Sequence, residues 1–177
     1  MISKKEFYFI RHGQTDYNVS DAKVDHEDVS LNAVGLRQAQ EAEPIIAKLP
    51  VKSICYSPLK RATETKEVIS TQLLAVHHEM LALGECSLQI WDDMTSCGPN
   101  AYLSGKEHVK DFIQRVRHGV NESLSLAGPP LIVAHGGIHW AICCLMGVVD
   151  HDWIIDNCLP VHFFPDDTGR WRARKLI

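Results

Sequence analysis

The sequence predicts an α/β fold, a three-layer α/β/α sandwich around a mixed, mainly parallel sheet. Short apolar stretches alternate along the chain with longer amphipathic ones, which is the order of strands and helices that builds a parallel sheet. The 177 residues, of which 45% are apolar and 23% charged, have the composition of a globular protein. This length suits one domain spanning residues 1–177, and such a chain buries roughly 70% of its unfolded surface without help from disulfides or metals.

The first half of the chain predicts two strand–helix units. Phe7–Ile10 is expected to form a buried strand, and Asn32–Leu49 has apolar residues at near-helical spacing. A second strand, Val51–Ser57, leads into another helix. We expect that helix to begin at Pro58 with Ser57 as its N-cap, because serine is favoured at the cap and proline in the first helical position.

The second half continues the alternation less regularly. The stretch that ends at Glu85 predicts a weaker third strand, and the following segment CSLQIWDDMTSCGPNAYLSG, with its glycines and proline, is expected to be irregular. A long amphipathic helix is expected at Lys106–Leu126. PPLIVAHGG then predicts a strand that leads into the helix IHWAICCLMG. The tail predicts two strands, CLPVHFFP and RWRARKLI, joined by a turn at Asp167–Gly169.

Charge and cysteine content limit the expected partners and location. A formal net charge of −4 argues against a nucleic-acid or acidic-membrane surface. The first ten residues hold too short an apolar run for a signal peptide or a membrane span. The six cysteines form no C-x-x-C metal pair, so we expect reduced, mostly buried thiols, none of them catalytic, in a cytoplasmic protein.

Three of the expected strands end in similar residues. Arg11 and His12 follow the first strand, Arg61 lies shortly after the second, and His135 and Gly136 follow the fourth. Because the carboxyl ends of parallel strands share one edge of a sheet, these residues are expected to converge there. Two arginines, two histidines and the N–H groups of helix N-termini suit a phosphoryl group, whose oxygens accept forked guanidinium donors.

Four sequence blocks resemble the histidine phosphatase superfamily, which includes the phosphoglycerate mutases. The blocks occur in the order of the family over almost the whole chain: RHGQT followed by Tyr17 and Asn18, SLNAVGLRQA (Ser30–Ala39), SPLKRATET (Ser57–Thr65) and VAHGG (Val133–Gly137). The resemblance implies that His12 is a nucleophile that carries the phosphoryl group as phosphohistidine. It also implies catalysis without a metal or cofactor. The phosphate-binding residues that it implies are Arg11, Asn18, Arg61, His135 and Gly136, of which both arginines and His135 also stabilise the transition state.

The resemblance also implies a general acid and base, Glu85. In the family this glutamate begins a pattern of the form E-x-x-F-G-x-W-E-G, and Glu85 and Trp91 stand at the matching separation. The other positions depart from the pattern, so the resemblance does not predict the shape of this loop. Leu88, Gln89, Asp92 and Asp93 replace the phenylalanine, the first glycine, the second glutamate and the second glycine.

These residues indicate a phosphatase that hydrolyses phosphate monoesters of small metabolites or of a phosphorylated protein. About twenty residues separate Glu85 from the next long helix, and so short a segment is expected to admit water to the phosphohistidine. Two alternatives remain open: a phosphoglycerate mutase-type phosphoryl transfer, and a weakly catalytic family member that binds phosphorylated ligands or proteins. Two further possibilities are a substrate contact by His26 and a metal shared by His135 and His139, four residues apart.

Overall fold

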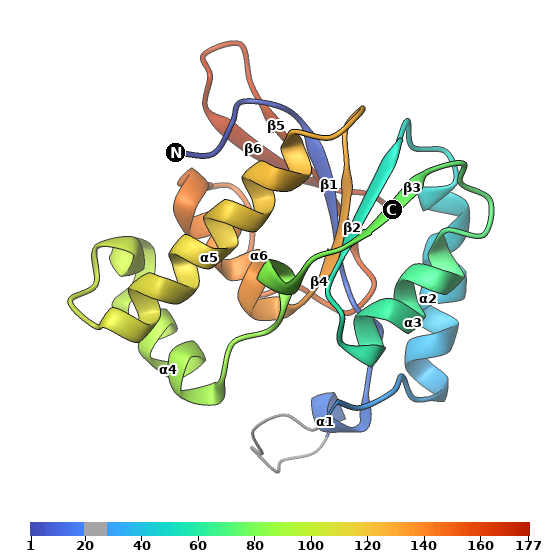
Figure 1. Ribbon diagram of the computed structural model, residues 1–177, viewed down its shortest axis with the longest axis horizontal. Coiled ribbons are helices and arrows are strands. Elements are labelled where there is room, and N and C mark those ends of the chain that lie inside the picture. The colour runs from blue at the N-terminus through green and yellow to red at the C-terminus, as the bar shows by residue number, and fades with distance from the viewer. Residues whose placement is uncertain (20–27) are drawn as a thin grey trace.

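The computed structural model describes residues 1–19 and 28–177 of the chain. Its centre is a sheet of six strands in the order β3-β2-β4-β1-β5-β6 (Figure 1). The strands β1 to β4 are parallel to one another, whereas β5 runs antiparallel to β1 and β6 antiparallel to β5. The sheet is therefore mixed and mainly parallel, as predicted. The strands are β1 (Phe7–Arg11), β2 (Ser53–Tyr56), β3 (Val76–Glu79), β4 (Leu131–Ala134), β5 (Pro160–Pro165) and β6 (Trp171–Lys175).

Helices cover both faces of this sheet. On one face lie α2 (Ala33–Ile46) and α3 (Lys60–Ile69), and on the other lie α5 (Glu107–Leu124) and α6 (Gly136–Met146), as Figure 1 shows. Successive side chains of a strand point to opposite faces. Accordingly, Tyr8 and Ile10 of β1 pack in the core beneath α2 and α3, while Phe7 and Phe9 pack in the core beneath α5 and α6. This arrangement confirms the three-layer sandwich.

The segment after Glu85 is folded, so the expectation that it is irregular was wrong. It forms the helix α4 (Leu88–Cys97) and the 3-10 helix η2 (Gly98–Leu103). The hydroxyl of Ser87 caps α4 by accepting from the Ile90 N–H at 3.3 Å, and Met94 of the same helix is buried in the core beneath α5 and α6. The glycine and proline that suggested a loop come after the last residue of α4, where they end it.

The start of α3 also differs from the prediction. The helix begins at Lys60 with Leu59 at the cap position, so Ser57 is not the N-cap and Pro58 is not in the first turn. Two short helices were not expected: α1 (Asp16–Val19) and the 3-10 helix η1 (Leu81–Leu83). In the part of the chain that the structure describes, no helix is long and apolar enough to cross a membrane.

Candidate active site

The loop that follows β1 brings His12 to the carboxyl edge of the sheet. The His12 N–H donates to the Ala134 carbonyl at 3.0 Å, and the side chain is 3% exposed. Gly13 then lies against the first turn of α2. A Cβ atom on Gly13 would lie 2.5 Å from the Gly35 carbonyl oxygen, so only glycine allows the two segments this close. The Gly13 N–H also donates to Thr65 Oγ1 of α3 at 2.9 Å, which ties the loop to both helices.

The hydrogen bonds of the His12 ring determine its tautomer. Nδ1 lies 2.7 Å from the Gly13 carbonyl oxygen. A carbonyl oxygen only accepts, so Nδ1 carries the proton and Nε2 keeps its lone pair. Arg61 Nε donates to that Nε2 at 3.2 Å. The reactive nitrogen of a neutral imidazole is therefore Nε2, and it faces a guanidinium group.

Arg11 and Arg61 place two desolvated positive charges beside His12. Arg61, at the start of α3, is 4% exposed, and Arg11 Nη1, at the end of β1, donates to the Ile155 carbonyl at 2.8 Å. Burial lowers the pKa of both guanidinium groups, and the negative charge of Glu85 partly opposes this. The buried Nε of Arg11 has no hydrogen-bond partner among the described residues. Two buried cations with spare donors are suited to binding a dianion.

His135 and the first turn of α6 form the next side of the site. His135 directly follows β4 and is fully buried, with its ring centroid 5.2 Å from that of His12. Its Nε2 lies 2.7 Å from the hydroxyl oxygen of Ser57. The next residue, Gly136, lies next to the Arg11 guanidinium, since a Cβ atom there would be in ordinary van der Waals contact with Nε at 3.7 Å. The start of α6, where N–H groups lack partners within the helix, thus lies beside Arg11.

Glu85 is held at the same helix start. Its Oε2 accepts from the Gly137 N–H at 3.1 Å and its Oε1 from the Cys86 N–H at 3.0 Å. A Cβ atom on Gly137 would lie 2.3 Å from Oε1 and 2.7 Å from Cys86 Sγ, so a larger residue there would displace the Glu85 carboxylate. These contacts place the carboxylate in a cavity of about 250 Å³. The cavity is lined by Arg11, Glu85, Cys86, Ser87, Leu88, Trp91, Gly136, Gly137, Ile154 and Ile155.

Asn18 lies at the edge of the site rather than inside it. It is exposed, and its Oδ1 accepts from the Thr15 N–H at 2.9 Å. Asn157, which sequence reasoning missed, donates from Nδ2 to the His12 carbonyl at 2.8 Å and lies 3.4 Å from Asn18 Oδ1. The structure therefore brings together Arg11, His12, Arg61, Glu85, His135 and Gly136, with Asn18 at the rim.

Comparison with known proteins identifies the family. The family model of the histidine phosphatase superfamily (branch 1) matches residues 7–159. The chain belongs to this superfamily. The uncharacterized phosphatase PhoE of Bacillus subtilis (strain 168) is 28% identical over 177 residues, which cover 93% of this chain and 90% of PhoE. A solved mycobacterial glucosyl-3-phosphoglycerate phosphatase in complex with VO3 is 25% identical, covers 97% of both chains and has a TM-score of 0.71.

One relative is a much larger protein. The agropine synthesis reductase of Rhizobium rhizogenes is 28% identical over 179 residues, which cover 89% of this chain but 39% of that protein. The chain therefore spans less than half the length of that relative, and its histidine phosphatase domain corresponds to one part of it.

A cysteine mechanism does not fit this histidine phosphatase. Cys55 stands six residues before Arg61, which is the C-x5-R spacing of cysteine-dependent phosphate loops. The spacing arises by coincidence, because Cys55 lies within β2, is fully buried and packs into the core beneath α5 and α6. Burial raises the pKa of its thiol to about 11, so the thiolate is scarce at neutral pH.

The sequence pointed to two further histidines, His26 as a substrate contact and His139 as a metal ligand beside His135. His26 lies outside the described residues. His139 faces away from His135, since its Nδ1 lies 2.9 Å from the Trp153 carbonyl and its Nε2 lies 3.1 Å from His151 Nε2. A metal shared by His135 and His139 has no support in this geometry.

Proposed function

We propose that this histidine phosphatase hydrolyses phosphate monoesters through a phosphohistidine on His12 Nε2. The observation that carries the proposal is the contact between His12 Nδ1 and the Gly13 carbonyl, which leaves the lone pair of Nε2 directed at Arg61. A nucleophile beside two buried guanidinium groups matches the demands of phosphoryl transfer, where charge builds up on the equatorial oxygens. The positive charges of the arginines offset this negative charge, so we infer that the chemistry needs no metal.

The first step transfers the phosphoryl group to the protein. The substrate phosphate takes over the Arg61 N–H that His12 accepts in the unliganded protein, and Nε2 attacks phosphorus. Glu85 enters this step in its protonated form. The bond between phosphorus and the ester oxygen breaks, the departing oxygen takes the proton of Glu85, and Glu85 is left as a carboxylate. The position of Glu85 beside Gly137 and Arg11, in the same cavity, supports this role.

The second step restores the protein. Glu85, now a carboxylate, removes a proton from water, and the resulting nucleophile attacks the phosphohistidine. The bond between Nε2 and phosphorus breaks, inorganic phosphate leaves, and His12 is neutral again. Arg11, Arg61 and His135, with the N–H of Gly136 and the amide of Asn18, hold the phosphoryl oxygens in both steps.

The cavity supports a small metabolite with an uncharged, apolar group next to the phosphate. Its wall consists of Leu88, Trp91, Ile154 and Ile155, and Arg11 is the one basic side chain that lines it within the described ranges. A substrate carboxylate would therefore meet apolar side chains and lose its hydration without compensation. This favours a phosphatase over a mutase, because phosphoglycerates carry such a carboxylate.

We place the protein in the cytoplasm as a single domain over residues 1–177. All six cysteines, which lie in the described part of the chain, are free thiols, and free thiols suit a reducing compartment. The net charge of −4 supports a metabolite rather than a nucleic acid as partner.

The test is the hydrolysis of p-nitrophenyl phosphate with a search for the adduct. Rapid acid-free quenching with labelled substrate should trap an acid-labile, base-stable phosphoryl group in the wild type. His12→Ala should abolish both the adduct and turnover, while His118→Ala, a change at an exposed histidine of α5, should leave both intact. Label on a serine or cysteine would overturn the mechanism. Stoichiometric phosphate binding without any turnover would show a binding protein instead.

A further inference from the structure

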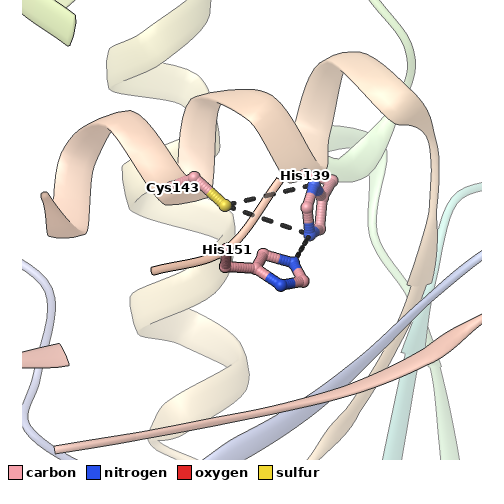
Figure 2. A group of neighbouring side chains, drawn as sticks. All are labelled: His139, Cys143 and His151. Atoms are coloured by element: carbon pink, nitrogen blue, oxygen red, sulfur yellow. Dashed lines mark hydrogen bonds between the residues drawn. The ribbon is translucent and has the colours of Figure 1, made fainter. Parts of the chain in front are cut away.

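A second cluster of side chains that can bind a metal lies along α6 and the segment that follows this helix. His139 and Cys143 are four residues apart, on one face of this helix, and His151 comes from the segment that follows it. Figure 2 shows that the three side chains point toward one another. His139 Nε2 lies 3.1 Å from His151 Nε2 and 3.9 Å from Cys143 Sγ. One ligand atom from each residue lies within 4.8 Å of the others.

These distances fit a tetrahedral Zn²⁺ ion. With Zn–N bonds of about 2.0–2.1 Å and Zn–S bonds of about 2.3 Å, two nitrogens lie about 3.3 Å apart and a nitrogen lies about 3.6 Å from the sulfur. The two separations from His139 Nε2 differ from these values by a few tenths of an ångström, and the Cys143–His151 separation is at most 4.8 Å, so side-chain rotation must bring those two residues closer. Two imidazoles and a thiolate are also donors that suit Zn²⁺, whereas harder cations such as Mg²⁺ and Ca²⁺ prefer oxygen ligands.

The surroundings of His139 orient it as a ligand. Its Nδ1 lies 2.9 Å from the Trp153 carbonyl, which only accepts, so Nδ1 carries the proton and Nε2 presents its lone pair. A carbonyl that holds the distal nitrogen in this way is the usual support of a metal-binding histidine. The His151 Nε2–H accordingly donates to His139 Nε2 in the metal-free protein.

Burial separates this cluster from ordinary surface residues. His139 and Cys143 are fully buried, and the His139 ring packs between Phe9 and Phe163, with centroid distances of 5.2 and 5.7 Å. His151 is only partly buried, so it gives the ion a route from solvent.

We propose that His139, Cys143 and His151 bind Zn²⁺ as a structural clip between α6 and the segment 147–159. On binding, the Cys143 thiol proton leaves to solvent, the His151 proton moves from Nε2 to Nδ1, and Zn²⁺ takes the three protein lone pairs, with a water molecule as its fourth ligand. The clipped segment provides the Ile155 carbonyl that holds Arg11 and the Asn157 amide that holds the His12 backbone. The ion does not touch the reacting atoms, so this inference stands independently of the proposed phosphatase reaction.

The test uses the full chain, stripped with a chelator and titrated with Zn²⁺ or Co²⁺ alone. The wild type should bind one ion, and the Co²⁺ form should show a thiolate-to-cobalt charge-transfer band. Cys143→Ser should abolish the band and weaken Zn²⁺ binding at least about tenfold. The matched control is Cys144→Ser, because Cys144 faces the Pro99 carbonyl at 3.5 Å and should leave the band unchanged.

A second variant keeps the test valid if Cys143→Ser folds poorly. His151→Ala changes a partly exposed side chain and should also weaken Zn²⁺ binding at least about tenfold. Zn²⁺ should slow amide hydrogen exchange in residues 147–159 of the wild type and not of this variant. The absence of one-to-one binding, a charge-transfer band that survives Cys143→Ser, or unchanged affinity in His151→Ala would overturn the site. If Zn²⁺ does not change amide hydrogen exchange of residues 147–159 in the wild type, the ion does not clip this segment to α6.

Discussion

Arg61 Nε donates to Nε2 of His12, the residue that we propose as nucleophile. This hydrogen bond keeps the His12 ring oriented before substrate binds. Arg61→Ala should lower kcat/KM for p-nitrophenyl phosphate by about 10²–10³-fold, the usual cost of one preorganised donor. We expect little change in Tm, because removing one of two neighbouring buried cations relieves their repulsion. Steady-state kinetics and thermal melting check both. Arg37→Ala, at an exposed position of α2, is the control, and a sharp fall in Tm with retained activity would make Arg61 structural.

Glu85 should matter in proportion to the basicity of the leaving oxygen. Glu85→Gln should slow alkyl phosphates by roughly 10²–10⁴-fold but p-nitrophenyl phosphate far less, because nitrophenolate departs without a proton. Kinetics on a series of esters with graded leaving groups measures this. Asp92→Asn is the control, because Asp92 is an exposed carboxylate of α4. Its neighbour Asp93 is less suitable, because it pairs with Lys106 and His108. Equal losses on both ester types would mean that Glu85 only shapes the cavity.

At the residue scale, the position of a candidate residue could be predicted where its residue type and its place at a strand end agree. Arg11 is the last residue of β1, and His12 and His135 directly follow strands, so the parallel sheet alone brings the three together. Ser57 and Asn157 were missed for different reasons. Ser57 resembles an N-cap until the true start of α3 is known. Asn157 reaches the His12 carbonyl from a segment 145 residues away that carries no local signal.

At the scale of elements, α4 forms the wall that should select the substrate. Trp91 lines the cavity from this helix. Trp91→Ala should lower kcat/KM for aryl phosphates about two- to tenfold, the effect of losing one aromatic contact, and change that for methyl phosphate little. A ratio of the two specificity constants measures the selectivity. Tyr102→Ala removes an exposed aromatic ring of η2, away from this cavity, and should leave the ratio unchanged, whereas an unaltered ratio in Trp91→Ala would contradict the proposed specificity.

The same helix shows why the segment after Glu85 could not be predicted. Its departures from the family pattern removed the usual guide, and Gly98 and Pro99 suggested a loop. In the structure these two residues end the helix, with Gly98 at a positive φ of 62°. The capping residue Ser87 and the buried Met94 are visible in the sequence, but their meaning depends on the surface of α5 and α6 that they meet.

At the scale of the whole molecule, the alternation of strands and helices predicts a parallel sheet but not the order of its strands. β1 lies between β4 and β5, and this order places His12 beside His135 and beside Asn157. Strand order depends on packing between residues that are distant in the sequence, here in the two cores that contain Phe9 on one face of the sheet and Ile10 on the other. The periodicity of apolar residues within one strand or helix does not indicate such packing.

The whole fold also bears on the acceptor of the phosphoryl group, which we predict to be water. A mutase must protect its phosphohistidine from hydrolysis while a monophosphate reorients, which requires a closed, dry site. Here only α4 and η2 occupy the segment between Glu85 and α5, which is little to close the site. Among the described residues, Arg11 is also the single basic residue that lines the cavity, so the carboxylate of a bound phosphoglycerate would lack a partner. With 3-phosphoglycerate and a trace of 2,3-bisphosphoglycerate we therefore expect little 2-phosphoglycerate.

With an aryl or alkyl monoester, inorganic phosphate should appear in step with the loss of substrate. Phosphorus NMR of both reactions, run with the same protein, follows isomerisation and phosphate release together. His12→Ala serves as the control, because it should stop both processes if they share one phosphohistidine. Isomerisation that runs many times faster than phosphate release would make the protein a mutase, and it would require that the wall formed by α4 closes over the cavity when a phosphoglycerate binds.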